Sequence, residues 1–135
     1  MTRIAAAFLL MAPLACRADL QPGNWEMSVT TQFEGAPNAM GPVVQTQCFT
    51  AQDVHDPHKI LGSAATSGCD FTNKRDTGSE FSFELKCSGQ IAMQGSGRAR
   101  YTATTLQADI ELDGNAAGQH FSTRSRISGR RLGGC

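Results

Sequence analysis

The sequence predicts an all-β fold: a single antiparallel meander that forms a strongly curved sheet or a partly closed barrel, with one short helix and two disulfides. The first observation behind this prediction is an alternation of apolar and polar residues with a period of two, interrupted by Gly, Asn, Asp and Ser, which is typical of short strands joined by turns. The second is a set of four cysteines downstream of an apolar N-terminal segment. A chain of 135 residues with no linker, low-complexity tract or repeat has the length of one small domain.

The first 18 residues have the layout of a secretory signal peptide. A basic start is followed by an apolar run over residues 4–14 and then by small residues. This run is shorter than the roughly 20 apolar residues that a membrane-spanning helix needs. We expect cleavage after Ala18, which leaves residues 19–135 as one domain without a transmembrane segment. The alternative is a lipoprotein signal in which Cys16 is acylated, although Pro13 stands where such signals usually carry a large aliphatic residue.

The expected mature chain is close to neutral. The whole chain has 12 basic and 12 acidic residues, and loss of Arg3 and Arg17 leaves 10 basic against 12 acidic residues, because the first 18 residues contain no Asp or Glu. Such a domain lacks the basic surface of a nucleic-acid-binding protein. We therefore expect no nucleic-acid partner.

Two strands begin the domain. Trp25, Met27, Val29 and Phe33 fall on one face of the first strand, with polar residues between them. The second strand runs over about residues 43–49.

A short helical connector follows the second strand. Thr50 has Asp53 three residues later, a start that resembles a capping box, and Pro57 ends the segment. His55 and His58 lie in this connector, but Pro57 interrupts the turn and no third histidine is near in the sequence. A solvated loop is therefore the preferred interpretation over a metal site.

The next hairpin brings two cysteines together. A turn centred on Gly78 sets Phe71 opposite Leu85 and Cys69 opposite Cys87. Opposed Cα atoms at a non-hydrogen-bonded position lie about 4.5 Å apart, which is within the range of a disulfide. We therefore predict a cross-strand disulfide between Cys69 and Cys87.

The remaining disulfide follows by elimination. Four cysteines allow three connectivities, and a Cys69–Cys87 bond leaves Cys48 to pair with Cys135. This bond would tie the end of the chain to the second strand.

Two further hairpins follow from the requirement that apolar residues stay on one face. Their turns are placed at residues 88–90 and 102–105. The first hairpin sets aromatic rings over strand glycines, a pairing that stabilises sheets. The expected opposed pairs are Met93 with Leu85, Gly95 with Phe83 and Gly97 with Phe81 across the first turn, and Gly97 with Ile110, Ala99 with Ala108 and Arg98 with Asp109 across the second.

A final strand covers about residues 120–127. It points Phe121 and Ile127 inward and brings Arg124 within reach of Asp109 on the outer face. The arginines of this region are interpreted first as a solvated cross-strand charge ladder. An anion or lipid-headgroup site is the less favoured alternative.

Four short motifs carry a family resemblance. They are Pro22-Gly23-Asn24-Trp25-Glu26, Gln47-Cys48-Phe49-Thr50, Cys87-Ser88-Gly89 and Gly129-Arg130-Arg131-Leu132-Gly133-Gly134-Cys135. With the four cysteines in order, the chain resembles the bacterial periplasmic domain-of-unknown-function family 3617 over essentially all of residues 19–135. The resemblance implies an exported, mostly β domain in the periplasm, with no catalytic residues to carry over. Members are often rich in methionine in the later strands, whereas this chain has only Met27, Met40 and Met93 after Ala18, which argues against a thioether copper site.

The sequence favours a binding protein over an enzyme. It contains no Gly-x-Ser-x-Gly elbow and no Cys-x-x-Cys pair. We therefore expect no catalytic residues, no cofactor and no metal.

A concave apolar face is the candidate site. Glycines in the middle of two strands leave a dip among larger residues, which is either filled by neighbouring rings or left open as a groove about as wide as an acyl chain. The residues of the possible groove are Phe83, Met93, Gly95, Gly97, Tyr101, Ile110 and Phe121. We expect an exported cell-envelope protein that binds a lipid or another apolar small molecule there. The alternative is a structural or protein-interaction module without a ligand, in which these residues are core.

Overall fold

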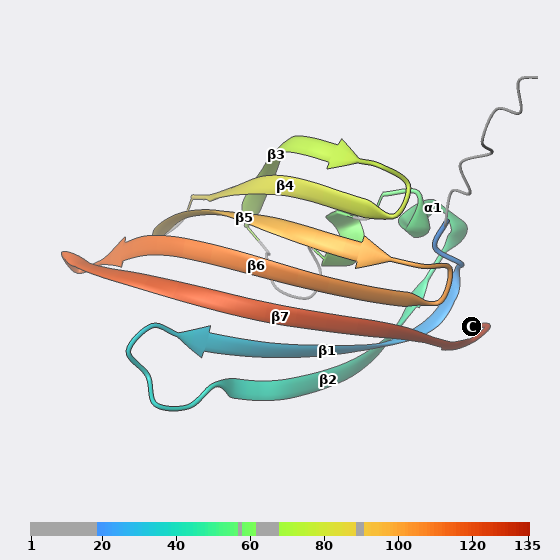
Figure 1. Ribbon diagram of the computed structural model, residues 1–135, viewed down its shortest axis with the longest axis horizontal. Helices are drawn as coiled ribbons and strands as arrows, with labels where there is room; N and C mark the ends of the chain where they lie inside the picture. Colours follow the sequence, from blue (N-terminus) through green and yellow to red (C-terminus); the bar gives the residue numbers. More distant parts are fainter. Residues whose placement is uncertain (1–18, 57, 62–67, 89–90) are drawn as a thin grey trace, which may run out of the picture.

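The computed structural model describes residues 19–56, 58–61, 68–88 and 91–135, which form one antiparallel sheet with short helical segments (Figure 1). The elements in chain order are β1 (Gly23–Phe33), β2 (Met40–Phe49), α1 (Ala51–Val54), β3 (Cys69–Asp76), β4 (Glu80–Cys87), β5 (Ala92–Tyr101), β6 (Thr105–Ala116) and β7 (Gln119–Gly133). The strand order in the sheet is β2-β1-β7-β6-β5-β4-β3. All neighbouring strands are antiparallel, which confirms the predicted fold class.

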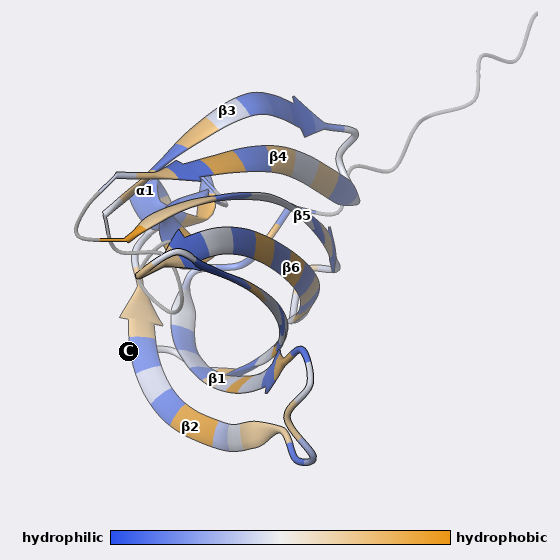
Figure 2. Ribbon diagram, turned by 90° about the vertical axis from the view of Figure 1, so that its left-hand side faces the viewer, coloured by the Kyte–Doolittle hydropathy of each residue, from blue (hydrophilic) through white to orange (hydrophobic). Residues whose placement is uncertain are grey.

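The sheet is strongly curved and open. Strands β3 to β7 form the predicted meander, and β7 returns alongside β1, which joins the N-terminal hairpin to the rest of the sheet. Strands β2 and β3 are its two edges. Figure 2 shows the sheet bent into a deep arc, with α1 on the concave side. The fold therefore offers one concave and one convex face.

The predicted first hairpin and its connector are confirmed. Trp25 and Met27 of β1 are each only 1% exposed on the concave face, whereas Cα pairing sets Glu26 opposite Thr46 of β2 on the other face. The capping box at the start of α1 is complete, because the Asp53 amide donates to Thr50 Oγ1 at 3.2 Å and the Thr50 amide donates to Asp53 Oδ2 at 2.8 Å.

The register of the β3–β4 hairpin is as predicted at its open end. Cys69 lies opposite Cys87, and Phe71 lies opposite Leu85. The Cα atoms of the two cysteines are 4.0 Å apart, and their sulfurs are bonded. Cys48 and Cys135 form the second disulfide, with Cα atoms 5.8 Å apart. Both disulfides therefore join the predicted partners.

The predicted register of the β4–β5 hairpin is wrong by two residues. The observed opposed pairs are Leu85 with Gly95, Phe83 with Gly97 and Phe81 with Ala99. The connection between Cys87 and Ala92 spans residues 88–91, which is longer than the expected turn. A shift of two residues keeps every side chain on its predicted face, so the apolar pattern could not distinguish the two registers.

The pairing of charges between β6 and β7 also differs from the prediction. Arg98 lies opposite Asp109 as expected, but Arg124 lies opposite Glu111 and not beside Asp109. Asp109 faces Arg126. The reason is again register, because the short connection between Ala116 and Gln119 sets the pairing of the whole hairpin.

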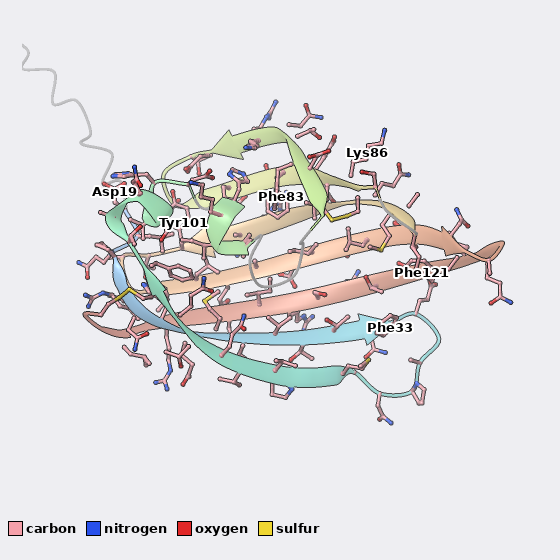
Figure 3. The ribbon with its side chains drawn as sticks, turned by 180° about the vertical axis from the view of Figure 1, so that it is seen from behind. Asp19, Phe33, Phe83, Lys86, Tyr101 and Phe121 are labelled. Carbon is pink, nitrogen blue, oxygen red and sulfur yellow. A yellow bond between two sulfur atoms is a disulfide. The ribbon has the colours of Figure 1, made fainter. Side chains whose placement is uncertain are left out.

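A helical turn over residues 58–61 adds to the single helix that was expected. Ile60 and Leu61 are 3% and 0% exposed and belong to the core cluster with Trp25, Phe81 and Leu106. Figure 3, which views the concave side, shows helical segments in front of the sheet near Tyr101 and Phe83. The helical turn over residues 58–61 therefore covers one end of the concave face.

Candidate functional site

The dip predicted at Gly97 is filled. Phe83 stands directly opposite Gly97, and its ring occupies the position where a Cβ at Gly97 would lie. The sequence allows either a dip filled by a neighbouring ring or a dip left open as a groove. At Gly97 the structure has the filled dip. The ring of Phe83 is itself 2% exposed, so no open groove passes over Gly97.

The same arrangement recurs at two other glycines. A Cβ at Gly114 would lie 2.6 Å from Phe121 Cζ and 2.9 Å from Met93 Cγ. A Cβ at Gly129 would lie 2.7 Å from the sulfur of Met27. Gly95 differs, because there the backbone of Glu111 and Leu112 approaches closely. Large side chains thus reach across from neighbouring strands to fill most of the dips in the inner face.

The seven residues of the predicted groove do not form one open site. Phe83, Tyr101 and Ile110 are 2%, 7% and 1% exposed and belong to the core. The Tyr101 hydroxyl donates to Asp76 Oδ1 at 2.8 Å, which ties the end of β5 to β3. Met93 and Phe121 are half-buried and lie toward the opposite end of the sheet from Tyr101.

His58 is mostly shielded from solvent by aromatic rings, contrary to the expectation of a solvated loop. Its ring centroid lies 5.4 Å from those of Phe71 and Phe81 and 5.7 Å from that of Phe83. The side chain is 11% exposed. The signal that could have revealed this burial is the pair Ile60-Leu61, which gives the short turn an apolar side.

The polar atoms of His58 have unequal environments. Nδ1 lies 3.2 Å from Asp56 Oδ1, and Nε2 is buried without a hydrogen-bond partner among the described residues. Burial lowers the pKa of His58 below its ordinary value, and the hydrogen bond to Asp56 only partly opposes this effect. Among the described residues, no group of three or more His, Cys, Asp or Glu side chains is placed to hold a metal ion.

The other end of the concave face is open. Phe33, Met40 and Val43 are 39%, 63% and 65% exposed there. Figure 3 shows Phe33 and Phe121 together at this end, away from Tyr101. We call this region the open end and define it by the inner-face residues Val29, Phe33, Met40, Val43, Leu112 and Phe121.

A pair of hydroxyl groups lies within the open end, in the inner-face row between Val29 and Phe33. Thr31 lies opposite Ser125, and their oxygens are 3.0 Å apart. Ser125 is 9% exposed. The open end is thus apolar, with two hydroxyls within it.

The outer face is charged, and most of its charges are paired across strands. Arg124 Nε donates to Glu111 at 2.8 Å, Arg130 Nε donates to Glu26 at 2.9 Å, and Arg126 lies 3.5 Å from Asp109. The hydrogen bond that Arg130 donates to Glu26 raises the pKa of the Arg130 guanidinium. A hollow of about 1040 Å³ lies over the outer face of β3 to β6. Its lining includes both acidic and basic side chains: Lys74, Arg75, Arg98, Arg100, Glu84, Asp109 and Glu111.

Among the described residues, no helix is long and apolar enough to cross a membrane.

Comparison with known proteins connects this geometry to one family. No curated protein and no solved structure matches the chain. The family model described as "Protein of unknown function (DUF3617)" matches residues 20–135, which include all seven strands and both disulfides. With this match over nearly the whole curved sheet, the chain belongs to the DUF3617 family.

Proposed function

We propose that this protein is a non-catalytic binding protein of the cell envelope that takes an apolar small molecule, such as the acyl chain of a lipid, at its open end. The observation that carries the proposal is the exposure of Phe33, Met40 and Val43 on a face whose other end is packed. Apolar side chains that gather in the open on one concave surface are typical of ligand and partner sites.

The packed end of the face limits where such a ligand fits. The ring of Phe83 fills the dip at Gly97, and Ile60 and Leu61 cover the neighbouring core. An acyl chain therefore has room only over the open end. Of the seven residues in the groove that the sequence suggested, the open end includes only Phe121.

The hydroxyl pair gives the site a polar contact. When Thr31 and Ser125 hydrogen-bond to one another, one hydroxyl hydrogen and several oxygen lone pairs stay available. Apolar pockets usually contain a few polar groups that orient the ligand. An amphiphile with one hydroxyl or carboxyl group fits this arrangement better than a pure hydrocarbon.

Export is part of the proposal. Disulfides persist in oxidising compartments such as the periplasm, and the two observed here support that location. Intact mass of protein from the periplasmic fraction tests it, and we expect a chain that begins at Asp19 and contains two disulfides. An acylated Cys16, or free thiols at the four bonded cysteines, would contradict this expectation.

Adjacent valines of β2 provide a matched test of the binding site. Val43 faces the open end, whereas Val44 is on the outer face and is similarly exposed, at 56% against 65%. We expect Val43→Gln to weaken the binding of a fluorescent fatty acid about three- to tenfold, since it removes part of the apolar contact. Val44→Gln should leave binding unchanged. Titration of the probe by fluorescence, with circular dichroism as a control for folding, measures both variants.

Absence of uptake would change the assignment. If the wild-type protein takes up neither the fatty acid nor an apolar dye at micromolar concentration, the ligand-binding proposal is wrong. The structural or protein-interaction role would then replace it.

A further inference from the structure

The charged side chains of the outer face are unevenly paired. Three arginines of β7 each lie beside a carboxylate of their own, in the pairs Arg124–Glu111, Arg126–Asp109 and Arg130–Glu26. On β5, by contrast, Arg98 and Arg100 share the carboxylate of Glu80, at 3.4 and 3.1 Å. Among the described residues, Lys74 and Arg75 of β3 form no ion pair. Within the described chain, these four basic groups of β3 and β5 thus form ion pairs with a single carboxylate.

The four basic groups line one hollow of the outer face. Its volume is about 1040 Å³, and it lies over β3 to β6. Strand pairing places Ser82 of β4 between Arg75 of β3 and Arg98 of β5. Because serine is short and its two neighbours are long, the basic side chains border the space above the Ser82 hydroxyl. We call this part of the hollow the positive end.

The adjacent part of the hollow is acidic. Strand pairing places Ser96 of β5 between Glu84 of β4 and Glu111 of β6. Glu84 accepts a hydrogen bond from Asn73 Nδ2 at 2.6 Å, and a neutral amide leaves the negative charge of the carboxylate in place. Ser82 and Ser96 are diagonal neighbours in the sheet, and such positions lie about 7 to 8 Å apart. The hollow therefore has a positive end next to a negative end.

A bulge in β3 gives the hollow one of its walls. Asn73 and Lys74 together stand against the single residue Phe83, because the pairing of β3 with β4 is interrupted between Thr72 and Arg75. In a regular strand, consecutive side chains point to opposite faces. Here the three consecutive residues 73–75 all line the hollow. The bulge therefore adds polar and basic groups to one face that regular alternation would divide between two.

We propose that this hollow binds a phosphoethanolamine group, with the phosphate over Ser82 and the ammonium over Ser96. Planar guanidinium groups match phosphate oxygens in bidentate hydrogen bonds, so Arg75 and Arg98 fit the phosphate. The ammonium donates hydrogen bonds to Glu84 and Glu111. The group is carried either by a free solute or by a lipid headgroup, and both present the same chemistry.

The inference does not rest on the proposed function. The hollow lies on the outer face, whereas the open end lies on the inner face of the same sheet. Phosphoethanolamine binding by a protein that takes up no fatty acid would leave this inference standing while the proposed function fails.

Titration calorimetry of the full oxidised chain with O-phosphoethanolamine at low ionic strength tests the positive end. We expect Arg75→Gln to weaken binding about three- to tenfold, because it removes a charged donor that has no other ion pair. Arg130→Gln is the matched control, since Arg130 is on the outer face, 66% exposed and outside the hollow. It changes the net charge equally and should leave binding unchanged. Circular dichroism checks that both variants fold.

Glu84→Gln separates a zwitterion site from a simple anion site. We expect this variant to weaken phosphoethanolamine binding about threefold or more, because the ammonium loses an ionic partner. Binding of inorganic phosphate should stay the same or tighten, because a nearby negative charge is removed. A glutamine oxygen still accepts the hydrogen bond from Asn73, so the bulge keeps its contact. Tighter binding of both probes to Glu84→Gln would show a site for anions alone and overturn the proposal.

Vesicles identify the source of the group. Co-sedimentation with phosphatidylethanolamine vesicles, lost in Arg75→Gln, would assign the ligand to a lipid headgroup. Binding of O-phosphoethanolamine without co-sedimentation would assign it to a free solute. A wild-type protein that binds neither probe at millimolar concentration overturns the proposal, and so does equal weakening by Arg75→Gln and Arg130→Gln.

Discussion

Phe83 of β4 lies with its ring over Gly97 of β5, the residue that it opposes in the sheet. This contact places an aromatic side chain where the backbone of a neighbouring strand leaves space, and it joins the middle of the sheet to the ring cluster of Phe71, Phe81 and His58. The glycine is thus part of the core packing.

Gly97→Ala should destabilise the fold. The added methyl group would collide with the ring of Phe83, which is 2% exposed and has little room to move. Overpacking of this kind costs about 1 to 3 kcal/mol. Urea unfolding followed by circular dichroism measures the loss. Gly134→Ala is the matched control, because no atom lies within 4 Å of a Cβ placed there. Equal stability of the two variants would show that the ring moves aside freely.

The two disulfides should contribute unequally to stability. Cys48 and Cys135 are separated by 87 residues, and Cys69 and Cys87 by 18. On the chain-entropy model the longer loop contributes about 4 to 5 kcal/mol and the shorter about 3 kcal/mol. Paired Cys→Ser variants of each bond, compared by urea unfolding, test this order. A larger loss from the Cys69–Cys87 pair would contradict the entropic explanation.

Stability should fall as the pH drops below neutrality because of His58. Burial lowers its pKa below the ordinary value of 6.5, with Asp56 and Asp76 opposing the effect and Lys74 adding to it. The unfolded chain therefore binds the proton more readily than the folded protein does. This contribution to stability is full above about pH 6.5, is lost as the pH falls toward the lower folded pKa, and changes no further below it.

Unfolding free energies at pH 7.5 and pH 5 give the measurement. We expect His58→Phe to reduce the difference between the two conditions, because a phenyl ring keeps the aromatic contacts and does not titrate. His55→Phe is the control, since His55 is exposed on the preceding turn. An unchanged pH dependence in His58→Phe would assign the effect to other groups.

Arg98→Ala should have little effect on the melting temperature. Arg98 Nε lies 3.4 Å from Glu80, its side chain is 66% exposed, and Arg100 holds the other oxygen of Glu80 at 3.1 Å. Exposed pairs contribute about 0.2 to 1 kcal/mol, and here one partner of Glu80 stays in place. Differential scanning calorimetry measures the shift. A loss of several kcal/mol would contradict this prediction and show that Arg98 stabilises the sheet by more than an exposed ion pair.

The sequence by itself determined which face each strand residue occupies. Alternation of apolar and polar residues leaves no choice of face wherever one side of the sheet is buried. It also determined the Cys69–Cys87 disulfide. The hairpin that places these two cysteines opposite each other is local, and its turn contains Gly78, which has a positive φ. With that bond assigned, Cys48 could pair only with Cys135 among the cysteines that follow Ala18.

The tertiary structure decided what the period-two pattern does not specify. A shift of two residues preserves every face, so the pairing of Phe83 with Gly97 and of Arg124 with Glu111 depends on how long each connection is. The burial of His58 with Ile60 and Leu61 depends on contacts with strands far along the chain, which a four-residue turn cannot signal by periodicity. For the same reason only the folded sheet shows that one end of the concave face is packed while the end with Phe33 and Val43 stays open.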